Sequence, residues 1–237
     1  MILSKNDIES IAQPIIQQYK KAFVPQHYLC YSIDPSKLAF LLGFRVEYRM
    51  LTVDGSVLGQ TASIPLWTTI IDPNMGETYY FLDGKTILVE ERLGNNPKLM
   101  GRKNFTIAHE LAHQIINRSF PNCYGLQNRV CCDYRRNIHF RKVNNWYEWQ
   151  ADALAAALLL PLEAIEDAMF IFGLGKHMKV LSRKYSESKF ECFCQMADYL
   201  QVSRTALAYR MEKLGLLDRN YMIKEAQQRR VRLGYEL

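Results

Sequence analysis

The sequence contains no low-complexity tract, no internal repeat and no long apolar segment. The absence of repeats excludes a solenoid. The longest apolar run, residues 153–160, is far shorter than the roughly 20 residues that a membrane-spanning helix needs. Asp7 and Glu9 interrupt the N-terminal segment before the apolar part of a secretory signal can form. We therefore expect a soluble, cytoplasmic protein with no membrane partner, in which the 6 cysteines stay reduced.

Positive charge is only mildly in excess, with 30 Lys and Arg against 24 Asp and Glu and a net charge of +6. The excess is concentrated in residues 98–142, where Glu110 and Asp133 are the only acidic side chains, and again in residues 229–232. A basic balance is typical of proteins with an anionic partner. Here the excess is small beside that of nucleic-acid-binding domains. A solvated basic face is therefore the favoured interpretation, and direct DNA binding is the less favoured one.

The hydrophobic pattern predicts a helix, then short strands, then helices again. The turn signal Asp83-Gly84 predicts that the strands on either side of it form a hairpin. With 49% apolar residues the chain can bury a sizeable core. This order predicts an α+β fold, in which a small, mostly antiparallel sheet packs on the helices of the active site. The expected helices are residues 6–19, 34–42, 105–116, 146–160, 162–172, 190–200 and 203–214, and the expected strands are 44–51, 67–71, 78–82 and 86–90.

The helix expected over residues 105–116 contains the motif His-Glu-x-x-His. Residues four apart lie on one face of a helix, so the imidazoles of His109 and His113 can reach a single metal ion. Glu110 can approach a water on that ion. Zinc lowers the pKa of such a water toward ~7, and a carboxylate can then take its proton. The motif therefore predicts one zinc per chain, with Glu110 as the catalytic general base.

A catalytic zinc usually has three protein ligands, so a third must come from another element. Glu148 and Asp152 lie four residues apart at the start of the otherwise apolar helix expected over residues 146–160. Carboxylates at the edge of a buried helix need partners, because an isolated buried charge is costly. We expect Glu148 to bind the metal and Asp152 to accept a hydrogen bond from the free ring nitrogen of His109 or His113. The alternative is that His109 and His113 are ordinary residues on a helix face and that the carboxylates of Glu148 and Asp152 are solvated.

Two motifs carry a resemblance to a known family. Phe105-Thr-Ile-Ala-His-Glu-Leu-Ala-His, together with Glu148-x-x-Ala-Asp-x-x-Ala-Ala-x-Leu-Leu-Leu-Pro161, resembles the ImmA/IrrE family of bacterial and phage metallopeptidases. The segments 32–44 and 202–216 are similar to the beginning and the later part of that family. The resemblance therefore spans roughly residues 30 to 217.

The resemblance implies a gluzincin-like site in which His109, His113 and Glu148 hold zinc and Glu110 is the catalytic carboxylate. Family members cleave helix-turn-helix transcriptional repressors in the cytoplasm. The resemblance therefore implies a zinc metalloendopeptidase whose partner is a protein substrate, a DNA-binding repressor.

We expect a zinc metallopeptidase domain over residues 1–175 and a helical, helix-turn-helix-like region over residues 176–237. In the helix pair expected between residues 190 and 214, Ser203, Arg204 and Thr205 begin the second helix, where DNA-reading side chains would lie. One basic residue is little phosphate-binding charge. Packing on the catalytic domain or docking of the substrate is therefore the favoured interpretation of this pair.

The segment 119–143 is rich in cysteine and arginine and looks longer than in the family, so it is interpreted as a lid, a substrate loop or a second metal site. It carries a second group of residues that could bind zinc as a structural ion: Cys123, Cys131, Cys132 and His139. No Cys-x-x-Cys spacing occurs there, so thiols without metal are favoured.

The sequence alone leaves two questions open. The side chain that stabilises the oxyanion could be Tyr147, His139 or a nearby arginine. The chain could also be a non-catalytic DNA-binding or adaptor regulator built on a peptidase-like scaffold. The intact motif argues against that alternative, because a scaffold has no need for Glu110.

Overall fold

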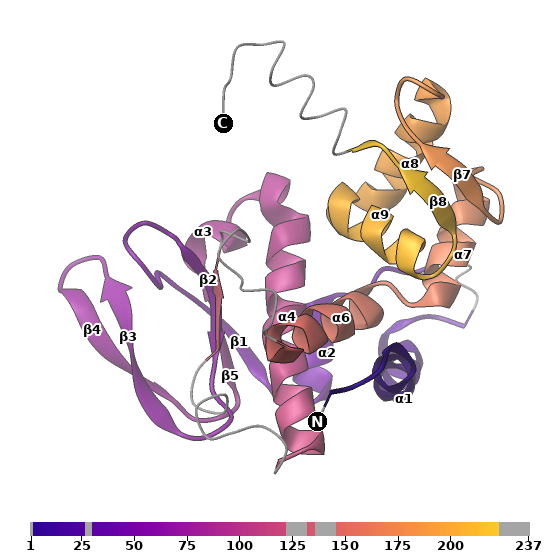
Figure 1. Cartoon of the computed structure of the whole chain (residues 1–237). Helices are drawn as coiled ribbons and strands as arrows, with labels where there is room; N and C mark the ends of the chain where they lie inside the picture. Colours follow the sequence, from indigo (N-terminus) through magenta and orange to yellow (C-terminus); the bar gives the residue numbers. More distant parts are fainter. Residues whose placement is uncertain (1, 27–29, 122–131, 136–145, 223–237) are drawn as a thin grey trace. The chain divides into compact units, whose positions relative to one another are not determined.

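The computed structural model describes residues 2–26, 30–121, 132–135 and 146–222, with the side chains of all of these except 132–135. The chain divides into two compact units, Met1–Gln26 with Ile33–Leu159 and His27–Ser32 with Leu160–Leu237. Each unit contains both helices and strands, so the predicted α+β class is confirmed (Figure 1). The functional division expected after residue 175 stays a prediction. In the part of the chain that the structure describes, no helix is long and apolar enough to cross a membrane.

The main sheet of the first unit has four strands in the order β1-β5-β2-β6. The parallel pair is β1–β5, with Val46 opposite Ile87, whereas β5–β2 and β2–β6 are antiparallel. The sheet is therefore mixed, and two of its three strand pairings are antiparallel, in keeping with the mostly antiparallel sheet expected. Its strands are β1 (Arg45–Arg49), β2 (Val57–Thr61), β5 (Thr86–Glu90) and β6 (Cys132–Arg135).

A second sheet of the first unit consists of β3 (Leu66–Asp72) and β4 (Gly76–Leu82), which pair antiparallel with Trp67 opposite Phe81. The predicted hairpin of β4 with β5 is wrong, because the chain changes sheets at Asp83-Gly84. The burial of the two strands explains the difference. All five residues of β5 are buried, as in a strand covered on both faces, whereas residues 77–81 of β4 alternate between exposed and partly buried.

The long helix α4 (Met100–Ser119) lies at the centre of the first unit. It packs against α2, α6, β2 and β5, and α6 packs in turn against α1 (Figure 1). Ile107, Leu111 and Leu154 are fully buried in this layer, so the apolar faces of α4 and α6 form much of the core. The remaining helices of this unit are α1 (Lys5–Phe23), α2 (Pro35–Leu41), α3 (Glu91–Gly94), the short 3-10 helix η1 (Pro97–Leu99) and α6 (Trp146–Leu159).

The second unit contains α7 (Leu162–Ile171), β7 (Met178–Leu181), α8 (Glu187–Tyr199), α9 (Arg204–Lys213) and β8 (Leu217–Asn220). The helices expected here are present, and Gln201, with a φ of 56°, turns the chain between α8 and α9. This region also contains two strands that the sequence did not predict, β7 and β8, which form a short parallel ladder. Strands of four residues are too short for the alternation of apolar and polar residues to show in the sequence. The helix-turn-helix-like character of α8 and α9 stays a prediction.

Candidate metal centre

Three polar residues of the His-Glu-x-x-His motif lie in the buried middle of α4. His109, Glu110 and His113 are each 0% exposed. The neighbouring turns of the helix are apolar and equally buried, at Ile107 and Leu111 among others, which holds the backbone of this segment in the core. Buried polar and charged groups persist in such a place only where other polar groups or a metal compensate them.

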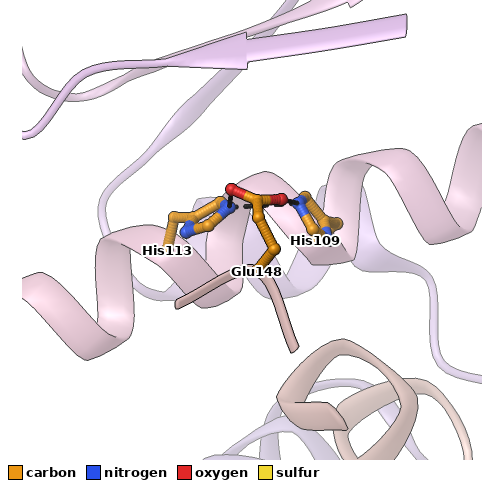
Figure 2. A group of neighbouring side chains, drawn as sticks. All are labelled: His109, His113 and Glu148. Carbon is orange, nitrogen blue, oxygen red and sulfur yellow. Dashed lines mark hydrogen bonds and ion pairs between the residues drawn. The ribbon is translucent and has the colours of Figure 1, made fainter. Parts of the chain in front are cut away.

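The helix α6 supplies the carboxylate that meets both imidazoles. His109 Nε2 lies 3.2 Å from Glu148 Oε2, and His113 Nε2 lies 3.4 Å from Glu148 Oε1. The two Nε2 atoms are 3.0 Å apart. Figure 2 shows the carboxylate of Glu148 directed between the two rings. Among the described residues, these three form the group of ligand atoms close enough together to hold one metal ion.

The geometry of these atoms fits a zinc ion. Zinc ligands at 2.0–2.1 Å in a tetrahedral arrangement lie about 3.3 Å from one another. The three separations here, 3.0, 3.2 and 3.4 Å, scatter around that value. Two imidazoles and one carboxylate are also a donor set of catalytic zinc sites, in which the fourth position is left for water or substrate. The residues present therefore match the ion that the sequence motif predicts.

Asp152, one turn further along α6 than Glu148, contacts the other nitrogen of His109. Its Oδ1 lies 2.9 Å from His109 Nδ1. In the neutral imidazole, a carboxylate at this distance accepts the Nδ1–H, which places the lone pair on Nε2, directed at the cluster. Burial lowers the pKa of His109, but hydrogen bonds with Asp152 and Glu148 outweigh it and raise the pKa to about 9. For Glu148 the signs are reversed. Burial raises the pKa of this carboxyl group, but its hydrogen bonds with His109 and His113 outweigh burial and lower the pKa.

His113 is held mainly by packing. Its ring lies 4.5 Å from the ring of Tyr147, centroid to centroid, at an interplanar angle of 34°. Asn117, one turn further along α4, donates from Nδ2 to the Tyr147 hydroxyl over 2.8 Å. Burial lowers the pKa of His113, which favours the neutral imidazole that a metal requires. Tyr147 thus contacts one of the predicted ligands directly, and its hydroxyl accepts a hydrogen bond from Asn117.

The structure brings four of the predicted site residues into direct contact: His109, His113, Glu148 and Asp152. Glu110 lies beside His109 on the same helix. Tyr147 packs on His113, whereas the other oxyanion candidate, His139, lies outside the described residues. The side chains of the proposed cysteine cluster, Cys123, Cys131 and Cys132, lie outside the described part as well.

Sequence reasoning missed two residues next to the site, Asn117 and Gly59. Asn117 is four residues after His113, so the helical spacing that relates the two histidines could have found it. Gly59 lies on β2 against Glu110. A glycine inside a strand often marks a close approach of the backbone to another group, so the glycine at residue 59 was the signal in the sequence.

A buried His-Glu-x-x-His helix with a third metal ligand, a carboxylate, from a second helix defines a metallopeptidase-type site. The family model described as the IrrE N-terminal-like domain of peptidase family M78 matches residues 70–212, more than half of the chain. The chain therefore belongs to the ImmA/IrrE family of metallopeptidases. The match contains both α4 and α6, the helices that supply the cluster. No curated protein matches the chain.

Proposed function

We propose that this protein is a zinc-dependent endopeptidase that cleaves a cytoplasmic DNA-binding repressor of the helix-turn-helix type. The observation that carries the peptidase activity is the buried cluster of His109, His113 and Glu148, with Glu110 on the same helix. Membership of a metallopeptidase family supports the same reaction. The identity of the substrate is supported by the resemblance to the family alone.

In this proposal His109, His113 and Glu148 hold the ion through the three donor atoms that converge in Figure 2. A bound zinc would supply Lewis acidity, polarising the scissile carbonyl and lowering the pKa of the attacking water. Asp152 keeps His109 in the tautomer that presents Nε2. The ring of Tyr147 restricts the orientation of His113.

Glu110 acts as the general base. It takes a proton from the water that attacks the peptide carbonyl and passes that proton to the nitrogen of the leaving amine. Its burial suits this task, because a carboxylate shielded from bulk water interacts more strongly with groups at the reaction centre. Tyr147 remains our candidate for binding the oxyanion. Asn117 donates to its hydroxyl, and a phenolic O–H can both accept and donate a hydrogen bond.

Specificity for one protein needs binding energy from contacts away from the scissile bond. The exposed surface of α8 and α9 is our candidate for these contacts. Arg204 and Tyr209 both lie exposed there, with about half of the side chain of Arg204 and half of Tyr209 accessible to solvent.

The test is co-expression of the chain with the product of a neighbouring repressor gene, followed by mass spectrometry of the fragments. We expect cleavage at one or a few positions, its loss on removal of metal with a chelator, and its return on addition of zinc. If purified, well-folded protein neither binds zinc nor cleaves any candidate repressor, the proposal is wrong. Binding to duplex DNA without cleavage would favour the non-catalytic regulator instead.

A further inference from the structure

Gly59, in the middle of β2, lies directly against the motif helix α4. A Cβ atom built on this glycine would lie 2.6 Å from Thr106 Cγ2, 2.9 Å from Glu110 Cγ and 3.0 Å from Glu110 Oε1. Carbon atoms in van der Waals contact are about 3.5–4.0 Å apart. The space that any other side chain would need at residue 59 is thus taken by Thr106 and by the carboxylate of Glu110.

The strand cannot easily move away, because a neighbouring pair of residues holds it to the same helix. Gln114 donates from Nε2 to Thr61 Oγ1 over 2.6 Å and to the Ala62 carbonyl over 2.7 Å. Thr61 Oγ1 in turn donates to the Thr86 carbonyl of the next strand over 3.2 Å. All of these side chains are buried, so the contacts are shielded from water.

The two contacts between β2 and α4 are about equally far apart on the strand and on the helix. Gly59 and Thr61 are two residues apart and point to the same face of β2, about 6.6 Å from each other. Glu110 and Gln114 are four residues apart on one face of α4, about 6 Å from each other. Because Thr61 is hydrogen-bonded to Gln114, Gly59 lies opposite Glu110. The hydrogen bond between Thr61 and Gln114 therefore fixes how strand and helix are aligned, two residues from Gly59 on the strand and one helical turn from Glu110.

We infer that Gly59 is a positioning residue for Glu110. The bare backbone of β2 bounds the volume in which the carboxylate lies, and any side chain at residue 59 displaces it. The backbone of Gly59 does not itself demand glycine, since its φ is not in the left-handed region. In a strand interior an alanine would ordinarily be preferred to glycine. The inference rests on the proposed role of Glu110 as general base.

The test is Gly59→Ala in the full-length, zinc-loaded protein. We expect kcat to fall about 10- to 100-fold, as for other small displacements of catalytic groups, with KM and zinc content nearly unchanged. The matched control is Gln60→Ala. Gln60 follows Gly59 and accepts a hydrogen bond from Thr68 on the other face of the strand, so its removal should leave kcat unchanged.

A second variant separates the two contacts of the new methyl group. Thr106→Ser removes Cγ2, the closest of the three atoms, and keeps the hydroxyl. In the Gly59→Ala/Thr106→Ser protein we expect part of the lost stability to return while kcat stays low, because the contact with Glu110 remains. Should Gly59→Ala alone fail to fold, the same comparison is made between the double variant and Thr106→Ser.

A readout independent of turnover is the coupling of Gly59→Ala with Glu110→Ala in denaturant unfolding. Truncation of Glu110 removes Cγ and Oε1, so Gly59→Ala should destabilise the Glu110→Ala protein less than the wild type. Additive effects on unfolding, or a Gly59→Ala protein with wild-type kcat, would overturn the inference. An inactive wild type would instead overturn the proposed function, and the coupling would still decide the contact.

Discussion

Replacement of Asp152 by alanine tests how the cluster prepares His109 for a metal. The carboxylate of Asp152 lies 2.9 Å from His109 Nδ1, on the side of the ring away from Glu148. Its removal takes away the group that fixes the tautomer and orientation of the imidazole. Losses of such partners typically weaken metal binding by roughly 10- to 100-fold. The variant should therefore still bind zinc, but more weakly.

The size of the loss should depend on pH. Hydrogen bonds with Asp152 and Glu148 raise the pKa of His109 to about 9, so at pH 7 the ring is doubly protonated and zinc must displace the proton on Nε2. Two pH units below the pKa, this competition weakens zinc binding by about 100-fold. Asp152→Ala removes one of the two hydrogen bonds that raise this pKa, so the variant meets less competition from protons at pH 7. The loss of zinc affinity relative to the wild type should therefore be smaller at pH 7 than at pH 9, where it reaches the full range of about 10- to 100-fold.

The assay is competition with a chelator of known zinc affinity at pH 7 and pH 9, with Glu148→Ala as comparison. Glu148→Ala deletes a direct ligand and should lose more affinity than Asp152→Ala at pH 9. The opposite ranking would exchange the roles assigned to the two carboxylates. A deficit of Asp152→Ala that does not change between the two pH values would refute the argument from proton competition.

Three further predictions follow from the same geometry. His113→Ala should lose zinc, measured by elemental analysis of folded protein, because only one imidazole remains. Tyr147→Phe keeps the ring against His113 but loses the hydroxyl, so chelator competition should show a smaller loss than the roughly 10- to 100-fold of a direct hydrogen-bond partner. Arg204→Ala/Tyr209→Ala should lower cleavage of the intact repressor more than that of a short peptide spanning the cut; equal losses would exclude docking there.

The sequence was most informative where one helix carries the chemistry. Residues four apart must share a face, so the position of His109 next to His113 follows from spacing alone. The helix α6 was predictable because its sequence is rich in alanine and leucine, and its two carboxylates stand out because they are the charged residues of a mostly apolar helix. The contact between Glu148 and the histidines was a hypothesis until the packing of α6 on α4 was known, since spacing within one helix says nothing of its distance to another.

The sheet was less predictable, because strand pairing is decided by contacts far apart in the chain. The strand β2 was not expected at all: Gly59 and Gln60 lower its β-propensity. The same Gly59 is what allows β2 to lie against α4. The assumed hairpin at Asp83-Gly84 relied on a turn signal that is local, whereas the uniform burial of β5 required its place in the centre of the other sheet.

The most direct test of the account is the comparison of wild type with Glu110→Gln, on protein whose zinc content has been measured. Glu110 is buried beside the proposed ligands and is not one of the three residues whose ligand atoms converge, so its amide analogue should fold and bind about one zinc per chain. We predict that the wild type cleaves the repressor and that zinc-loaded Glu110→Gln does not. Undiminished cleavage by the zinc-loaded variant would contradict the assignment of Glu110 as the general base.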